Sequence, residues 1–172
     1  MKKVAIFGSI GSIGTSTLNV IRENPDLFRV VTLVAGKNVT KLVEQIEEFH
    51  PQNVYITSEE NANLLKAKFP DLAVYYGEEG MEAISNLTDF DISVSALVGI
   101  SGLKPTYNMI KHGKTVALAN KEVLVTGGKI IMQTAKESGA KLLTVDSEHS
   151  AIMQCLNGEI ENKISKILLT AS

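Results

Sequence analysis

Two acidic residues that follow an apolar stretch of the chain could together bind a metal ion. Asp146 and Glu148 come directly after the run 142–145, Leu-Leu-Thr-Val. Side chains two residues apart in extended backbone point to the same side, so the two carboxylates could converge. Mg²⁺ and Mn²⁺ prefer oxygen ligands, and this pair supplies part of such a site. The alternative is a helix start, with Asp146 as the N-cap and Glu148 as a first-turn acid. His149 is expected to pack or hydrogen-bond rather than to bind metal.

A glycine-rich loop near the N-terminus has the features of a phosphate-binding site. Gly8, Gly11 and Gly14 follow the apolar run 4–7 and precede a helical pattern. Glycine lets the backbone turn sharply and approach a pyrophosphate, while N–H groups at the start of a helix donate to phosphate oxygens. The spacing G-x-x-G-x-x-G departs from the usual dinucleotide motif G-x-G-x-x-G. The loop predicts a nucleotide cradle, and the alternative is an ordinary strand-to-helix turn.

The end of the second predicted strand indicates which nucleotide would bind. An NAD-binding protein usually carries Asp or Glu here to hold the ribose hydroxyls. This chain has Gly36-Lys37-Asn38 and then the start of a helix. A lysine, an amide and a helix N-terminus suit a 2′-phosphate, which favours NADP over NAD. The alternative is that Lys37 is only a solvated surface lysine.

Two more groups of polar residues stand at predicted strand ends, where ligands of parallel α/β sheets bind. The run Asn-Lys-Glu at 120–122 follows the strand 115–119 and is either a site or a helix start or solvated loop. Thr170 and Ser172 place hydroxyl groups at the end of a last predicted strand, 164–170. These hydroxyls could meet a substrate phosphate.

Short β-branched runs alternate with amphipathic stretches, which predicts βαβ units and a Rossmann-like, doubly wound, mostly parallel α/β sheet. The first predicted strand ends at Gly8, and the other predicted strands span 28–35, 54–56, 73–76, 92–96, 115–119, 142–145 and 164–170. The predicted helices span 12–23, 39–49, 59–69, 82–87, 102–112, 127–138 and 147–156. The final strand has no following helix to cover it, so we expect the chain to be part of a longer protein.

Composition and charge exclude several classes of protein. The 172 residues are 44% hydrophobic and 21% charged with a net charge of −2, which is ordinary for a globular domain and gives no reason to expect a nucleic-acid or membrane partner. The N-terminus has no signal-peptide pattern, so we expect a cytoplasmic protein. Cys155 stands among apolar residues and is expected to be a buried structural thiol.

Four segments together resemble one enzyme family in order and context. They are Gly8–Gly14, Val34–Val39, Leu118–Glu122 and Val145–His149, and the family is 1-deoxy-D-xylulose 5-phosphate reductoisomerase. The resemblance implies conversion of 1-deoxy-D-xylulose 5-phosphate to 2-C-methyl-D-erythritol 4-phosphate in non-mevalonate isoprenoid synthesis, with NADPH and Mg²⁺, Mn²⁺ or Co²⁺. It also implies a homodimer at full length, inhibition by fosmidomycin, an NADPH-binding domain at 1–146 and the start of a second α/β catalytic domain at 147–172.

The resemblance assigns roles to individual residues. The cofactor-binding residues would be Ser9, Ile10, Gly11, Ser12, Ile13, Gly36, Lys37, Asn38, Asn120 and Glu122. Substrate would contact Lys121, Ser147, Glu148 and Ser172. Lys121 and Glu148 would be catalytic, and Asp146 and Glu148 would bind the metal.

Two departures from the family pattern qualify these roles. The family usually has threonine where this chain has Ile10, which removes one hydroxyl but leaves the backbone cradle. The family's third metal carboxylate, its tryptophan-containing flap and its C-terminal helical domain would lie beyond Ser172. We therefore expect the 172-residue chain to bind NADPH without turnover. The alternatives are a different NADPH-dependent reductase and a non-catalytic module that senses NADPH.

Overall fold

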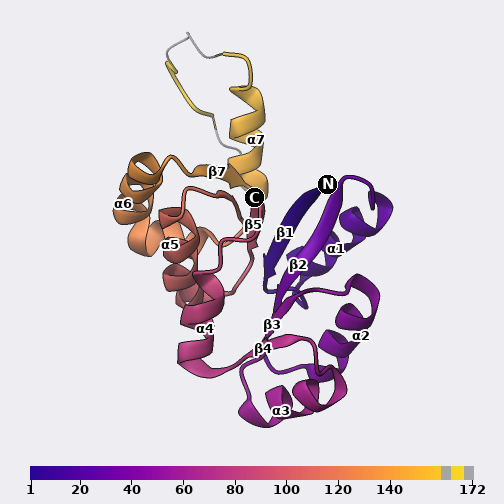
Figure 1. Ribbon diagram of the computed structural model, residues 1–172. Helices are drawn as coiled ribbons and strands as arrows, with labels where there is room; N and C mark the ends of the chain where they lie inside the picture. The colour runs from indigo at the N-terminus through magenta and orange to yellow at the C-terminus, as the bar shows by residue number, and fades with distance from the viewer. Residues whose placement is uncertain (160–163, 169–172) are drawn as a thin grey trace.

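The computed structural model describes residues 1–159 and 164–168, which alternate strands and helices (Figure 1). The strands are β1 (Lys2–Phe7), β2 (Phe28–Val34), β3 (Asn53–Tyr55), β4 (Ala73–Tyr75), β5 (Ile92–Ser95), β6 (Thr115–Leu118) and β7 (Lys141–Thr144). The helices are α1 (Ser12–Glu23), α2 (Val39–Phe49), α3 (Glu59–Lys68), α4 (Gly77–Ser85), α5 (Leu103–Lys111), α6 (Lys121–Ser138) and α7 (Ser147–Cys155), with a 3₁₀ turn at Gly99–Gly102 before α5.

The strands form one sheet in the order β4-β3-β2-β1-β5-β6-β7, and every pairing is parallel. The chain builds outward from β1 to β4, then returns to the other side of β1 and builds outward again to β7. This doubly wound α/β arrangement confirms the predicted fold class. Because all strands run the same way, their carboxyl ends share one edge of the sheet.

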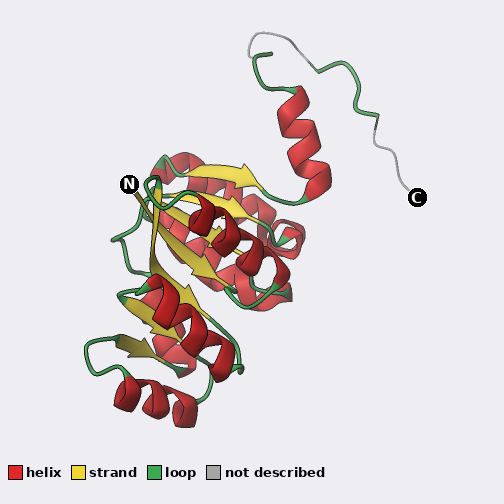
Figure 2. Ribbon diagram, turned by 90° about the vertical axis from the view of Figure 1, so that its right-hand side faces the viewer, coloured by secondary structure: helices red, strands yellow, loops and turns green. Residues whose placement is uncertain are grey.

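Two hydrophobic cores cover the two faces of the sheet, as the alternation of side chains along a strand requires. Val4 and Ile6 of β1 point into a core that also receives residues of α1, α2 and α3. Ala5 and Phe7 point into the opposite core, which α4, α5 and α6 complete. The helices therefore lie in layers in front of and behind the strands (Figure 2).

Three predicted helix or strand bounds are wrong. Helix α6 begins at Lys121 rather than at 127, because the Asn120 side chain accepts a hydrogen bond from the Val123 N–H and caps the helix there. Helix α4 spans Gly77–Ser85 rather than 82–87. Residues 164–168 form no strand, and the rest of that predicted strand lies outside the described residues.

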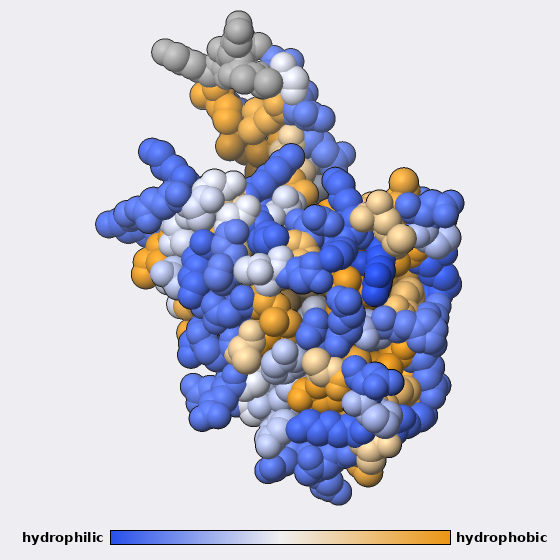
Figure 3. Space-filling model, viewed as in Figure 1, coloured by the Kyte–Doolittle hydropathy of each residue, from blue (hydrophilic) through white to orange (hydrophobic). Residues whose placement is uncertain are grey.

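Helix α7 extends away from the sheet and buries none of its own residues (Figures 1 and 2). Apolar side chains gather on this projecting part of the surface (Figure 3), and Met153 and Leu156 are among the exposed large hydrophobic residues. Cys155 is exposed as well, so the prediction of a buried thiol is wrong. An apolar sequence neighbourhood indicates burial only where another element packs against it.

Candidate nucleotide and metal site

The predicted site residues follow four different strands and so share the carboxyl edge of the sheet. Gly8 follows β1, Gly36 follows β2, Asn120 follows β6 and Asp146 comes two residues after the end of β7. The strand order puts β2 beside β1 on one side and β5, β6 and β7 in succession on the other. With neighbouring strands about 4.8 Å apart, the acidic pair lies about 14 Å along the edge from the glycine loop.

The glycine loop is held closely against its surroundings. Gly8 has a φ of +97°, and a Cβ placed there would lie 2.4 Å from the Ala96 carbonyl oxygen. A Cβ on Gly14 would lie 2.2 Å from the Gly8 carbonyl oxygen. The Gly8 and Ser9 N–H groups both donate to the Val34 carbonyl, at 2.9 and 3.0 Å, which ties the loop to the end of β2. Positions 8 and 14 therefore require glycine, because a Cβ at either would overlap the neighbouring backbone.

Helix α1 presents uncapped N–H donors above this loop. Its N-cap is Gly11, which has no side chain to accept from the first turn. The Thr15 hydroxyl bonds back to the Gly11 carbonyl at 2.7 Å and so does not cap the helix. First-turn N–H groups lack partners within a helix and carry the positive end of its dipole, so Ser12 and Ile13 can donate to an anion. Ile10 is partly buried and packs against the core that α1 and α2 share.

Residues 36–38 form an exposed loop that opens helix α2. The Asn38 side chain accepts from the Lys41 N–H at 3.1 Å and caps the helix. The loop backbone is fixed from two neighbouring segments, because the Gly36 carbonyl accepts from the N–H of Thr57 after β3 and the Lys37 carbonyl accepts from the side chain of Asn61 in α3. Lys37 itself is exposed beside this helix N-terminus, where its charge can reach a phosphate.

Asn120 uses its side chain within the protein. It is 4% exposed, and its amide nitrogen donates to the carbonyls of Leu97 and Gly99, the latter at 2.8 Å. Its oxygen caps α6, whose first turn contains the exposed Lys121 and Glu122. Asn120 therefore fixes the loop after β5, and its contact with a cofactor remains a prediction.

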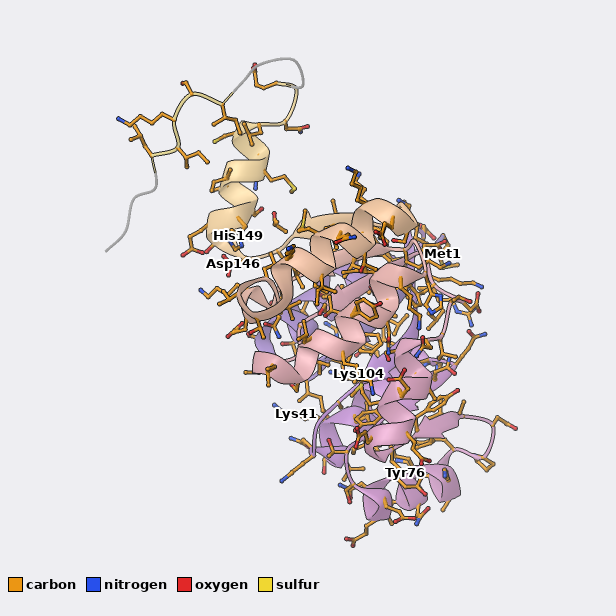
Figure 4. All side chains as sticks on the ribbon, turned by 90° about the vertical axis from the view of Figure 1, so that its left-hand side faces the viewer. Met1, Lys41, Tyr76, Lys104, Asp146 and His149 are labelled. Carbon is orange, nitrogen blue, oxygen red and sulfur yellow. The ribbon has the colours of Figure 1, made fainter. Side chains whose placement is uncertain are left out.

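The acidic pair lies with a lysine and a histidine at the base of α7. Lys121 Nζ and His149 Nδ1 lie 3.8 Å from the two carboxylate oxygens of Asp146, whose side chain is 15% exposed. Figure 4 shows Asp146 and His149 side by side at this point. The Ser147 hydroxyl donates to Glu148 Oε2 at 2.8 Å. The pKa of Glu148 is lowered to about 2, first by this hydroxyl and then by backbone N–H, Asp146 and the charge of Lys121.

Both interpretations of the acidic pair find some support in this geometry. Asp146 occupies the N-cap position of α7 but its side chain caps no N–H group, whereas Glu148 lies in the first turn. The lowered pKa of Glu148 favours its ionised form, and an ionised carboxylate suits a hard divalent cation. Among residues 1–159 and 164–168, no three His, Cys, Asp or Glu side chains gather as a metal site. The described carboxylates thus fit part of a metal site rather than all of it.

A largely apolar hollow of about 540 Å³ lies beside the acidic pair. It is lined by residues of α6, β7 and α7 that include Leu124, Ile152 and Met153. Its lining would accept an apolar group in preference to a phosphate. Ser172 and Thr170, which were predicted to bind phosphate, lie outside the described residues.

Sequence reasoning missed three contributors to the site: Gln45, Asn61 and the loop Leu97–Gly99. Gln45 and Asn61 donate side-chain hydrogen bonds to the carbonyls of Ser9 and Lys37. A polar residue on the inner face of an amphipathic helix was the available signal for Gln45. The loop 97–99 follows the carboxyl end of β5, and its position after a strand together with Gly99 could have indicated it.

Comparison with protein families gives matches over most of the chain. The model of 1-deoxy-D-xylulose 5-phosphate reductoisomerase matches residues 4–128, and the model of the C-terminal domain of the same enzyme matches residues 142–172. A curated 1-deoxy-D-xylulose 5-phosphate reductoisomerase of Bacillus cereus is 48% identical over all 172 residues. The chain spans 45% of the length of that relative.

Solved structures give the same result in three dimensions. A crystal structure of DOX-P reductoisomerase in complex with NADPH, fosmidomycin and magnesium is 39% identical, with a TM-score of 0.88 over 94% of this chain and 40% of that one. The 1-deoxy-D-xylulose 5-phosphate reductoisomerase from Zymomonas mobilis in complex with NADPH is 36% identical, with a TM-score of 0.84 over 90% of this chain and 41% of that one.

Proposed function

The chain belongs to the 1-deoxy-D-xylulose 5-phosphate reductoisomerase family, and from that membership we propose that it is the NADPH-binding part of an enzyme that converts 1-deoxy-D-xylulose 5-phosphate to 2-C-methyl-D-erythritol 4-phosphate in non-mevalonate isoprenoid synthesis. One observation carries the proposal. A cationic helix N-terminus, a glycine cradle and an acidic pair follow one another along a single edge of the sheet. This order suits a cofactor that extends from its 2′-phosphate towards a metal-bound substrate.

The cradle and the start of α2 would hold the cofactor. The N–H groups of Ser12 and Ile13 would donate to the pyrophosphate, since the helix dipole favours an anion there. Lys37 and the N-terminus of α2 would hold the 2′-phosphate. The nicotinamide would then lie over β5 and β6, where Asn120 fixes the loop 97–99. Bound in this way, NADPH supplies the hydride for the reduction.

The group at the base of α7 would bind the substrate and the metal. Asp146 and Glu148 would hold Mg²⁺, Mn²⁺ or Co²⁺, which as a Lewis acid stabilises negative charge on the substrate carbonyl and hydroxyl oxygens. The exposed ammonium of Lys121 would bind the anionic substrate and offset the charge of the two carboxylates. The Ser147 hydroxyl keeps Glu148 ionised and so ready to accept a cation.

The proposal includes the organisation of the protein. Residues 1–146 would form the cofactor domain and 147–172 the beginning of the catalytic domain, which the two family matches at 4–128 and 142–172 support. The described residues would supply two carboxylates, Asp146 and Glu148, to the metal site. The 172 residues would bind NADPH without catalysing turnover. At the length of the relatives the protein would be a cytoplasmic homodimer. Within the described residues, no helix is long and apolar enough to cross a membrane.

Cofactor binding is tested on this chain by titration with NADPH and NADH, followed by fluorescence. NADPH should bind more tightly, and Lys37→Asp should weaken NADPH at least tenfold while leaving NADH within twofold. Lys41→Asp is a matched control, because Lys41 is an exposed lysine in the first turn of α2, four residues after Lys37. Equal losses for the two cofactors in the Lys37 variant would contradict the 2′-phosphate assignment.

Catalysis is tested with a protein of the relatives' length that contains this chain. It should oxidise NADPH when given 1-deoxy-D-xylulose 5-phosphate and Mn²⁺, and fosmidomycin should inhibit it. Turnover that is insensitive to fosmidomycin would favour another NADPH-dependent reductase. Full activity in both Asp146→Ala and Glu148→Ala would favour a module that senses NADPH. Turnover by the 172 residues alone would contradict the expected division of the site.

A further inference from the structure

Gln45 is a buried polar residue on the otherwise apolar inner face of α2. It is 9% exposed, and its neighbours on that face, Leu42 and Ile46, belong to the hydrophobic core. Its amide nitrogen donates to the Ser9 carbonyl of the glycine loop at 3.0 Å. The bond joins residues that are 36 positions apart in the sequence. Gln45 therefore connects α2 directly to the cradle.

Ser9, which accepts this hydrogen bond, also packs against the first turn of α1. It is fully buried, and its N–H is held by the Val34 carbonyl. Gly14 packs directly against it, since a Cβ on Gly14 would lie 2.6 Å from the Ser9 Cα. A displacement of Ser9 would thus move the N–H groups that face the pyrophosphate.

Helix α2 joins Gln45 rigidly to the N-terminus of the same helix. Gln45 lies seven residues after Asn38, which caps the helix beside Lys37. A helix is rigid over this distance of about 10 Å. The Gln45–Ser9 bond consequently sets how far the cradle lies from the start of α2.

The details of this contact favour a positioning role over simple stabilisation. Gln45 Oε1 and Ser9 Oγ are both buried without a hydrogen-bond partner among the described residues. Buried polar atoms without partners lower stability, so an apolar side chain at position 45 would pack at least as well. The amide supplies one thing that leucine or methionine cannot, namely a neutral N–H donor aimed at the loop backbone.

We propose that Gln45 is a specificity-determining positioning residue, which fixes the spacing between the pyrophosphate cradle and the 2′-phosphate site and so favours NADPH over NADH. The inference rests on the proposed cofactor and goes beyond it, because the amide of Gln45 is bonded to the loop backbone and acts on the cofactor only through that loop. A ligand that binds both places at once needs the correct spacing. NADH has no 2′-phosphate and does not need the site at the start of α2. Its affinity therefore depends little on the distance between the cradle and that site.

The test measures the dissociation constants of NADPH and NADH on the 172-residue chain and its variants. Gln45→Met keeps the length of the side chain and removes the donor, and Gln45→Leu removes the donor with a branched apolar side chain. Both variants should bind NADPH about tenfold more weakly and NADH less than threefold more weakly. Thermal unfolding checks that each variant is folded.

Asn108→Leu is the matched control. Asn108 is 3% exposed in the opposite core and donates a buried amide hydrogen bond to Ser85 Oγ at 2.9 Å. Its loss should lower the melting temperature and leave the preference for NADPH unchanged. An unchanged preference in both Gln45 variants would overturn the inference alone. Failure of the unmodified chain to bind NADPH would overturn the proposed function and the inference with it.

Discussion

Replacing Gly14 by alanine is expected to weaken NADPH binding at least a hundredfold by moving helix α1. The added Cβ would lie 2.2 Å from the Gly8 carbonyl oxygen and 2.6 Å from the Ser9 Cα, whereas ordinary contacts begin at 3.4 Å. The helix must therefore move by about 1.2 Å, and overpacking of this kind costs about 1–3 kcal/mol of stability. The displaced N–H groups would no longer reach the pyrophosphate, because hydrogen bonds require donor–acceptor distances near 2.9 Å.

The loss of affinity follows from the number of donors that move. Hydrogen bonds to a charged group are worth about 1.5–3 kcal/mol each, so losing the two from Ser12 and Ile13 costs about 3–6 kcal/mol. At about 1.4 kcal/mol for each factor of ten, NADPH should bind at least a hundredfold more weakly. Calorimetric titration measures this loss, and thermal unfolding measures the accompanying loss of stability.

Two other glycine-to-alanine changes serve as matched controls. At Gly11 a Cβ would lie 3.4 Å from the Gly8 carbonyl oxygen, an ordinary contact, so Gly11→Ala should lower stability less than Gly14→Ala does and should weaken NADPH binding by obstructing the approach of the pyrophosphate. At Gly128, within α6, a Cβ would lie 4.0 Å from the nearest side chain. Gly128→Ala should stabilise the protein by up to about 1 kcal/mol and leave affinity unchanged. A folded Gly14→Ala that binds NADPH normally would refute this account of the cradle.

Two further predictions concern Ile10 and Glu82. Ile10→Thr should change NADPH affinity less than threefold, because the cradle acts through backbone N–H groups; a tenfold gain, about 1.4 kcal/mol, would instead show that a hydroxyl at this position binds the cofactor. The same change should lower the free energy of unfolding by about 1 kcal/mol, since Ile10 packs against the core. Lys104 Nζ lies 3.0 Å from the Glu82 carboxylate and lowers the pKa of Glu82 below its usual 4.5. The ion pair therefore stabilises the fold above pH 4.5, and this stabilisation is lost as the pH falls through the folded-state pKa of Glu82. Glu82→Gln should therefore lower the melting temperature at neutral pH and cease to do so in acid; an equal effect at both pH values would contradict the assignment.

Local sequence signals predicted the fold well where elements had clear periodicity and clear ends. The bounds of α1 and α2 agree with the prediction, because the apolar residues recur at helical spacing and Asn24-Pro25 and His50-Pro51 follow the helices. The start of α6 was wrong because Gly127-Gly128 resembles a boundary. In the structure Gly127 lies inside the helix, where a Cβ would come within 2.6 Å of Leu103 Cδ1. That glycine lies where α6 packs against α5, a contact that no local pattern reveals.

Residues at strand ends were predictable because a parallel sheet brings them to one edge. The glycine loop, Lys37, Lys121 and the pair Asp146–Glu148 lie at this edge, as their positions after strands predict without any knowledge of side-chain contacts. Position after a strand does not indicate which polar groups are already hydrogen-bonded within the protein. The side chain of Asn120 illustrates this, since its sequence position suggests a ligand contact and its hydrogen bonds run to Leu97, Gly99 and Val123.

The hydrogen bonds by which Gln45 and Asn120 hold neighbouring loops were not predicted, for the same physical reason. A glycine-containing loop has few side chains with which to anchor itself, so its position must be fixed through its backbone carbonyls by donors on neighbouring elements. A neutral amide meets this need, because it can be buried without the cost of burying a charge. In the sequence such an amide looks either like an isolated polar residue on the apolar face of a helix, as at Gln45, or like an ordinary helix N-cap, as at Asn120. Residues that position a phosphate cradle are therefore best sought as buried amides facing the loop from adjoining helices, and Gln45 is the one that links the cradle to the start of α2.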